Sequence, residues 1–283
     1  MMRIPSSFSL PHFRQRGFTL VEMVVVIVIT GIIGGIVAMF IRAPVQGYVD
    51  SARRAEMTDI ADTALRRMGR DLRLALPNSV RVSGTCDGAA ACYLEFIPTS
   101  SGGRYRVDAP GNILDFTASD SSFDVIGPMP GFAAGDSIVV YNLGITGASA
   151  YDNGTGAANC AASPNCTTYS SNTATTVTIA GKQFPFDSPA HRFQVVQSPV
   201  TYACDSASGT LRRYWNYGFW AVQPAPPAGG SSALLATNVS ACSFVYDANV
   251  VAQRSGLVTM RLTITQSGGS VALYSATHVS NVP

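Results

Sequence analysis

Glu22 is the only ionisable residue in an apolar run that covers residues 18–41. A helix of about 20 apolar residues is long enough to cross a bilayer. A carboxylate near the start of such a helix is costly in hydrocarbon, because it must be buried as an ion or neutralised. The chemistry open to this position is charge pairing with a cationic group, which makes Glu22 a candidate functional residue.

The residues just before this run suggest where the chain is processed. The basic stretch Arg14-Gln15-Arg16-Gly17 lies directly ahead of Phe18. An ordinary secretory signal has its cleavage site after the apolar region, at small residues. Here the obvious junction, between Gly17 and Phe18, comes before the apolar region. Cleavage there leaves the apolar helix on the mature protein.

The same segment carries a resemblance to known proteins, and it reads Arg16-Gly17-Phe18-Thr19-Leu20-Val21-Glu22-Met23-Val24. It resembles the class III signal of type IV pilins and type II secretion pseudopilins. The resemblance implies that a prepilin peptidase cuts after Gly17 and methylates the new amine of Phe18. It also implies that Glu22 pairs with the terminal amine of a neighbouring subunit in a filament, which neutralises two costly charges. The alternative is a plain signal anchor in which Glu22 lies near the headgroups and has no role.

Basic residues on the two sides of the span predict its orientation. The leader, residues 1–17, carries Arg3, Arg14 and Arg16 and no acid, whereas the stretch after Arg42 mixes both signs. Positive charge stays cytoplasmic, so everything after residue 41 is exported. We therefore expect a single-pass protein of the bacterial inner membrane with its head in the periplasm.

Helix-weakening residues lie within and just after the span, at Gly31, Gly34, Gly35 and Pro44. Glycine and proline weaken a helix interior, but in lipid the backbone stays helical because no water can satisfy it. We expect residues 31–44 to be the place where the helix can unwind once it enters a filament. Close packing against a neighbouring helix is the other role that the glycines can have.

The charge balance excludes one large class of function. Three of the 19 basic residues lie in the leader, which leaves 16 against 17 acids. Proteins that bind nucleic acid through bulk charge concentrate basic surface, so no nucleic-acid partner is expected. The roughly 240 residues beyond the membrane segment are enough for one substantial core.

Catalytic and metal-binding patterns are missing from the sequence. The exported histidines, His191 and His278, show no triad spacing, and no G-x-S-x-G is present. There is no C-x-x-C, and Asp152-Asn153-Gly154 lacks the spacing of further calcium ligands. We predict that the protein is not an enzyme and needs no metal or cofactor.

Six cysteines on the exported side of a membrane predict disulfides, and they are Cys86, Cys92, Cys160, Cys166, Cys204 and Cys242. Two pairs, 86/92 and 160/166, are close in sequence and lie in loop-like stretches. The third pair, 204/242, joins two strand-like segments. Six cysteines permit fifteen pairings, so this connectivity is one suggestion among them.

Residues 50–76 have the periodicity of an amphipathic helix. Apolar residues recur at every third or fourth position from Met57 to Leu76, and charges occupy the other positions. Pro77 ends the helix, because the residue before a proline avoids helical geometry. The sequence thus predicts one helix over residues 18–76, with a transmembrane half at 18–41 and an amphipathic half that packs on the head.

Residues 77–283 break into short strand-like runs separated by Gly, Pro, Asn and Ser, which predicts an antiparallel β-rich head. The expected strands are 93–97, 105–107, 113–116, 137–141, 175–179, 192–196, 200–204, 210–214, 242–246, 257–266 and 271–279. Ser267-Gly268-Gly269-Ser270 is expected to join the last two as a hairpin. The predicted fold class is α+β and type IV pilin-like, with a long N-terminal helix packed on an antiparallel sheet and loops pinned by disulfides.

Two further segments are candidates for contact with a ligand or another subunit. Residues 142–173 are rich in Gly, Ala, Ser, Asn and Thr, and predict a surface loop pinned by Cys160 and Cys166. Residues 214–220 contain both tryptophans, Trp215 and Trp220. They form either a contact surface or part of the core, and we favour core packing.

Several short segments beyond the signal carry a second resemblance: Tyr48-Val49-Asp50, Leu76-Pro77-Asn78-Ser79-Val80-Arg81-Val82, Phe193-Gln194-Val195-Val196, Pro199-Val200-Thr201-Tyr202, Gly209-Thr210-Leu211, Tyr214-Trp215, Gly256-Leu257-Val258-Thr259 and His278-Val279-Ser280-Asn281-Val282-Pro283. They are similar to the MshO-type component of mannose-sensitive haemagglutinin (MSHA) pilus biogenesis. This resemblance implies a minor pilin or pseudopilin that helps initiate or cap a type IV pilus filament. The implied partners are the prepilin peptidase, the major pilin and other minor pilins through the N-terminal helix, the inner-membrane assembly platform and membrane lipid.

Other functions stay open at this point. The near neighbour is a J-type pseudopilin of type II secretion. A second class is a membrane-anchored adhesin or ligand-binding module, with residues 142–173 or the Trp215 and Trp220 region as its binding surface. An anchored exported enzyme is disfavoured, because the residues needed for catalysis are not present in a recognisable pattern.

Overall fold

The computed structural model describes residues 17–86, 90–251 and 255–283, and the side chains of all of these except 249–251. The chain divides into two units, Met1–Ala52 and Arg53–Pro283, which are described one at a time. Arg3, Arg14 and Arg16, on which the predicted orientation depends, lie outside the described residues.

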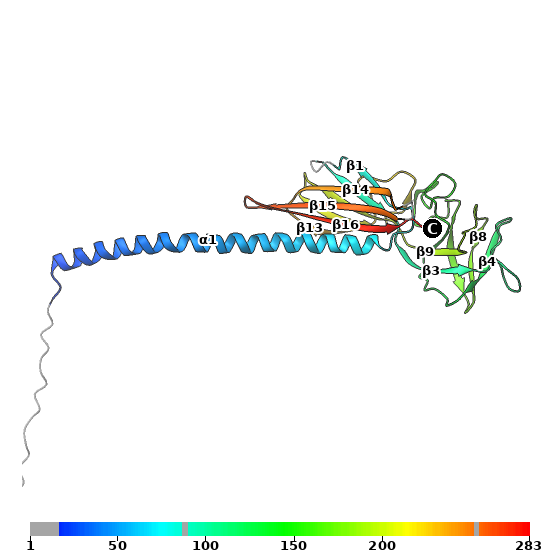
Figure 1. The fold of residues 1–283 in the computed structure, drawn as a ribbon, viewed down its shortest axis with the longest axis horizontal. Helices are drawn as coiled ribbons and strands as arrows, with labels where there is room; N and C mark the ends of the chain where they lie inside the picture. The colour runs from blue at the N-terminus through cyan, green and yellow to red at the C-terminus, as the bar shows by residue number, and fades with distance from the viewer. Residues whose placement is uncertain (1–16, 87–89, 252–254) are drawn as a thin grey trace, which may run out of the picture. The chain divides into compact units, whose positions relative to one another are not determined.

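A single long helix, α1 (Leu20–Leu72), begins in the first unit (Figure 1). Every residue from Leu20 to Tyr48 is exposed, although most of them are apolar. Among the residues that the structure describes, α1 is the one helix long and apolar enough to cross a membrane. Gly31, Gly34, Gly35 and Pro44 all lie inside it. A helix that is apolar all round belongs in a bilayer or in the interior of an assembly.

The end of α1 comes earlier than its periodicity predicts, at Leu72 rather than at Leu76. Beyond Leu72 the chain turns, and Ala75 forms an antiparallel bridge with Pro98. The N–H of Leu76 then donates to the carbonyl oxygen of Ile97 at 2.8 Å. The helix ends at Leu72 because the backbone of Ala75 and Leu76 pairs with Ile97 and Pro98 instead of continuing the helix. Local periodicity does not reveal such a pairing.

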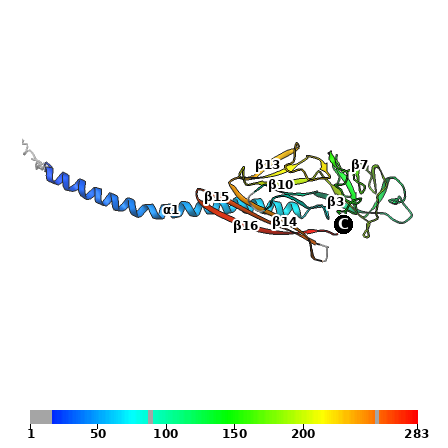
Figure 2. The same ribbon diagram turned by 90° about the horizontal axis from the view of Figure 1, so that it is seen from above.

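Two antiparallel sheets and residues 53–72 of α1 enclose the main core of the second unit (Figures 1 and 2). The strands of the first sheet are, in order, β1 (Arg81–Gly84), β2 (Cys92–Phe96), β10 (Val200–Asp205), β11 (Thr210–Trp215) and β13 (Ser231–Ala236). Those of the second are β14 (Val239–Val251), β15 (Ser255–Gln266) and β16 (Gly269–Ser280).

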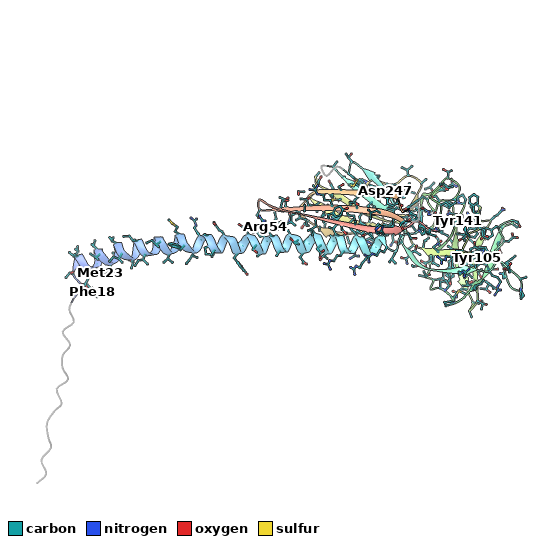
Figure 3. All side chains as sticks on the ribbon, viewed as in Figure 1. Phe18, Met23, Arg54, Tyr105, Tyr141 and Asp247 are labelled. Atoms are coloured by element: carbon teal, nitrogen blue, oxygen red, sulfur yellow. A yellow bond between two sulfur atoms is a disulfide. The ribbon has the colours of Figure 1, made fainter. Side chains whose placement is uncertain are left out.

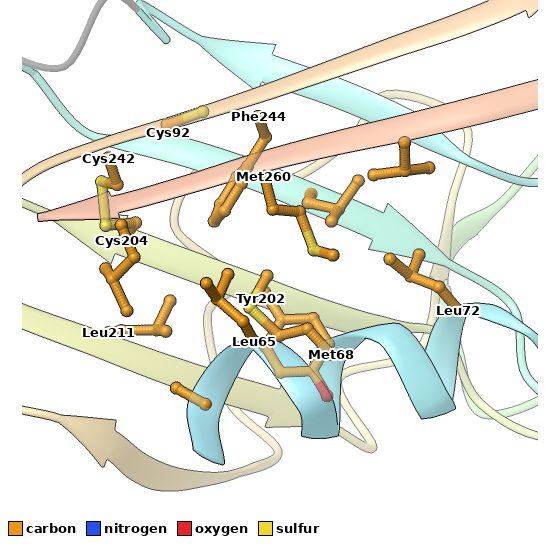
Figure 4. Packing of buried hydrophobic residues seen from close by; sticks show 14 of the residues in the cluster. Leu65, Met68, Leu72, Cys92, Tyr202, Cys204, Leu211, Cys242, Phe244 and Met260 are labelled. Carbon is orange, nitrogen blue, oxygen red and sulfur yellow. A yellow bond between two sulfur atoms is a disulfide. The ribbon is translucent and has the colours of Figure 1, made fainter. Parts of the chain in front are cut away.

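One face of α1 is buried in this core, as the amphipathic pattern predicts. The buried helix residues are Met57, Ala61, Ala64, Leu65, Met68, Gly69 and Leu72. Figure 4 shows Leu65 and Met68 beside Tyr202 of β10, with Met260 of β15 in the same cluster. Burying each large apolar side chain contributes about 1.5–3 kcal/mol, so this face fixes the helix to both sheets. The predicted α+β class is confirmed.

A closed six-stranded barrel and a two-stranded sheet of β6 (Thr155–Ala157) and β12 (Phe219–Trp220) complete the described part of the head, and the sequence did not predict the barrel. Its strands are, in order around the barrel, β3 (Thr99–Tyr105), β4 (Asp120–Ile126), β8 (Thr176–Lys182), β7 (Cys166–Asn172), β5 (Ser137–Val140) and β9 (Arg192–Val196). Tyr105, Phe123 and Phe193 are among the buried residues inside it. Gly103 of β3 leaves room for the Phe193 ring, which would lie 2.9 Å from a Cβ at that position.

Nine of the eleven predicted strands are found, and two predictions are wrong. Residues 113–116 form no strand, because Asp115 accepts hydrogen bonds from the N–H and hydroxyl of Thr117, which bends the chain. The strand expected at 105–107 ends at Tyr105, since β3 is built from the polar residues before it.

The hairpin between β15 and β16 is tighter than expected: Gln266 pairs with Gly269, and Ser267 and Gly268 turn at φ values of 50° and 82°. Positive φ at both positions is what a two-residue hairpin turn requires.

Residues 142–173 are not the surface loop that their composition suggests. The segment contains β6 (Thr155–Ala157) and β7, and a third core cluster includes its Ala150, Tyr151, Cys160 and Cys166. Small polar residues can be buried here because they are hydrogen-bonded. The buried Asn142 donates to the carbonyl of Pro77 at 2.6 Å and accepts from the N–H of Ala150 at 2.8 Å.

Three disulfides join Cys86 to Cys92, Cys160 to Cys166, and Cys204 to Cys242. These are the pairs that sequence position suggested. The third connects β10 of the first sheet to β14 of the second, and both of its cysteines are buried. It therefore links two sheets that share no strand pairing.

Candidate functional site

The junction between Gly17 and Phe18 lies in non-helical backbone just before α1. Phe18 is 76% exposed, and Gly17 and Thr19 are exposed as well. Figure 3 labels Phe18 just before the helix and Met23 near its beginning. A peptidase needs an accessible, unfolded stretch of backbone, and this junction provides one within the first unit.

Thr19 caps the start of the helix. Its Oγ1 accepts a hydrogen bond from the backbone N–H of Glu22 at 3.2 Å, and its carbonyl accepts one from Met23 at 3.2 Å. A side-chain oxygen at this position satisfies an N–H group that has no partner within the helix. Thr19 was not predicted as a functional residue, although threonine followed three residues later by glutamate is a known helix-start signal.

Glu22 lies in the first turn of α1 and is exposed. A carboxylate there is favoured by the partial positive charge at the helix N-terminus. Within the described residues, no ion pair involves the Glu22 carboxylate. From Phe18 to Ile41 it is the one ionisable group.

Residues 12–38 match the model of the prokaryotic N-terminal methylation motif. This motif supports a type IV pilin-like protein, a component of a pilus or pseudopilus. It implies interaction with a prepilin peptidase and with other pilins, and a structural rather than an enzymatic role. Together with the single apolar helix it is consistent with a membrane-anchored pilin. No curated protein and no solved structure matches the chain.

The head contains a buried ion pair that the sequence did not reveal. Glu95 on β2 is fully buried, and its Oε1 lies 2.8 Å from a guanidinium nitrogen of Arg81 on β1. The Arg81 guanidinium also lies over the ring of Tyr151, 3.7 Å from its centroid, and donates to the carbonyl of Ala221. Burial raises the pKa of Glu95 above its ordinary value, although Arg81 opposes the shift. Arg81 thus connects the edge strand β1 to Tyr151 and to the backbone of Ala221.

A second polar cluster fixes the last turn of α1 to the first sheet. Asp71 accepts hydrogen bonds from the hydroxyl of Tyr202 at 2.7 Å and from Nε of Arg213 at 3.0 Å. Burial and the hydrogen bond to Asp71 raise the pKa of Tyr202. Asp71 therefore connects the last turn of α1 to both β10 and β11.

The other residues considered from the sequence are not brought together. Nδ1 of His191 lies 3.4 Å from Oδ1 of Asp187, whereas His278 is on β16. Within the described ranges no group of three or more His, Cys, Asp or Glu residues is placed to hold a metal ion. The aromatic segment is divided: Tyr217 and Phe219 are buried, while Trp220 is 38% exposed.

Proposed function

We propose that this chain is a minor pilin or pseudopilin that is cut between Gly17 and Phe18 and helps initiate or cap a type IV pilus-like filament. The observation that carries the proposal is the capped start of α1, with Glu22 in its first turn and an exposed apolar surface behind it. In that role Glu22 pairs with the methylated amine of a neighbouring subunit inside the apolar stem of the filament. The MSHA type is the specific system that the sequence resemblance favours.

The proposed topology places the leader in the cytoplasm and the head in the periplasm. The three leader arginines support this orientation, because positive charge is retained on the cytoplasmic side. Three disulfides in the head support it independently, since disulfides persist in oxidising compartments such as the periplasm.

The test compares Glu22→Gln and Glu22→Ala with the parent chain and with Thr30→Val, a change within the same helix that leaves the carboxylate in place. Leader removal is followed by the change in mass, and assembly by filament number and by co-purification of sister minor subunits. We expect normal leader removal in all of them and reduced assembly only in the Glu22 variants. An uncompensated buried charge costs about 3–5 kcal/mol, enough to prevent stable incorporation. Normal assembly of a correctly processed Glu22 variant would contradict the proposed pairing.

A further inference from the structure

The outer strand of the second sheet, β16, has a long free edge. Its twelve residues pair with β15 without any shift in register, and no strand in the described part of the chain pairs with its other side. Natural sheets protect such edges with charged residues, proline, bulges or very short strands. Residues 269–280 contain no proline and no Asp, Glu, Lys or Arg. The other outer strand of this sheet, β14, is interrupted by two shifts in register, and the outer strands of the first sheet are shorter, β1 with four residues and β13 with six.

A groove of about 530 Å³ runs between this strand and α1 within the second unit. One wall is formed by residues 275–277 of β16, and the other by Arg66, Arg70 and Arg73 of the helix. The groove is narrow at its base, because a Cβ at Gly69 would lie 3.0 Å from Oγ1 of Thr277. The absence of a side chain at Gly69 lets helix and strand approach closely there.

The helix wall of the groove is strongly basic. Arg66, Arg70 and Arg73 are exposed, and Arg66 is paired with Asp62 at 2.7 Å. Neither Arg70 nor Arg73 has an acidic partner among the residues that the structure describes. Like charges one helix turn apart repel one another and destabilise a helix, so a bound anion would relieve a cost that the free protein bears.

We propose that this groove accepts an extended, acidic segment of a neighbouring filament subunit, which adds to β16 as a further strand. The inference rests on the proposed function for the existence of such a neighbour. Backbone groups of the segment pair with the free edge, and this mode of recognition gives affinity without requiring a particular sequence. The arginines then select the charge of the side chains that point toward α1.

The spacing of the two elements fits this arrangement. Arg66 and Arg73 are about 10 Å apart along the helix axis, at 1.5 Å per residue. Alternate residues of a strand lie on the same face and are about 6.6 Å apart. Two carboxylates at alternate positions of the added strand can therefore reach two different guanidinium groups. Charge-assisted hydrogen bonds of this kind are roughly twice as strong as neutral ones.

The experiment uses the full chain in detergent and fluorescent octapeptides as probes. One peptide alternates Thr and Glu, a second alternates Thr and Lys, and a third has the Thr-Glu sequence with every backbone nitrogen methylated, so that it cannot donate hydrogen bonds. Fluorescence anisotropy is measured for the parent chain, for Arg70→Gln/Arg73→Gln, and for Arg67→Gln. Arg67 is an exposed arginine of the same helix that does not line the groove, so it is the matched control.

We expect the Thr-Glu peptide to bind the parent chain and the Arg67→Gln variant equally, and the double variant at least tenfold more weakly. The Thr-Lys and methylated peptides should not bind. Failure of the Thr-Glu peptide to bind, or equal binding by the double variant or by either control peptide, would overturn the proposal. Self-association of the parent chain that the double variant loses would identify a second copy as the occupant, and would also overturn it. The assay needs neither leader cleavage nor filaments, so its result is independent of the test of the proposed function.

Discussion

The backbone N–H of Glu22 donates a hydrogen bond to Oγ1 of Thr19 at 3.2 Å. This contact sets the start of α1 immediately after the junction between Gly17 and Phe18. It leaves the junction in open backbone and puts the one carboxylate of the apolar stem into the first helical turn. In the proposed function, a single threonine thus separates the stretch that a peptidase would reach from the stretch that stays helical.

Replacing Thr19 by alanine is expected to loosen the first turn. Loss of a helix cap costs about 0.5–2 kcal/mol, because an N–H group loses its acceptor. Amide hydrogen exchange of Glu22 and Met23 in the detergent-solubilised chain should become about five times faster or more, whereas Thr19→Ser should retain most of the protection. Unchanged exchange in Thr19→Ala would show that the cap does not hold the helix start.

The features of the fold that depend on local pattern were predictable. The apolar run, the buried stripe of the amphipathic half and the alternation of β15 each follow from side-chain periodicity along one element. The barrel was not predictable from the sequence, because its strand β3 begins Thr99-Ser100-Ser101-Gly102-Gly103 and has no apolar pattern of its own. It is a strand because β9 and β4 pair with its two sides.

The disulfide between Cys204 and Cys242 is expected to contribute more stability than the one between Cys86 and Cys92. The first closes a separation of 38 residues and the second a separation of 6. In the chain-entropy model these correspond to about 4 and about 2 kcal/mol. Urea denaturation without reductant should show a lower midpoint for Cys204→Ala/Cys242→Ala than for Cys86→Ala/Cys92→Ala. The opposite order would mean that packing around the cysteines, and not loop length, determines their effect.

Glu95 is expected to make the stability of the head depend on pH. Burial raises the pKa of Glu95 in the folded protein above its unfolded value, so the folded state binds the proton more tightly. The stabilising contribution of the protonated group is complete below the unfolded pKa and is lost as the pH rises through the folded one. The parent chain should therefore lose stability relative to Glu95→Gln as the pH rises from about 3.5 toward neutrality, because the pKa of Glu in the unfolded chain is about 4.3.

This dependence is measured as the difference in urea midpoint between the two chains at each pH. Arg81→Gln is a useful companion, since removing the guanidinium should raise the pKa of Glu95 further and extend the dependence to higher pH. If the difference in urea midpoint between the parent chain and Glu95→Gln stays constant with pH, or if the parent chain becomes relatively more stable as the pH rises, then the pKa of Glu95 is not raised in the folded protein.

The site in the first unit was more predictable than the polar clusters of the head. Gly17, Phe18 and Glu22 are adjacent in sequence, so their types and order carry the inference directly. The polar cluster of the head contains Arg81 and Glu95, which lie on neighbouring strands. It also contains Tyr151, which comes from a segment whose composition suggested a surface loop. Such a cluster depends on how distant segments pack, which the order of residues does not reveal.

The proposed function depends on processing of the chain as a pilin, and the mass of the N-terminal peptide measures this processing. The protein is extracted from membranes of cells that contain a prepilin peptidase, digested, and its first peptide is sequenced by mass spectrometry. We predict a chain that begins at Phe18 and carries a methylated amine. A chain that begins at Met1, or one that begins beyond Ile41, would contradict it.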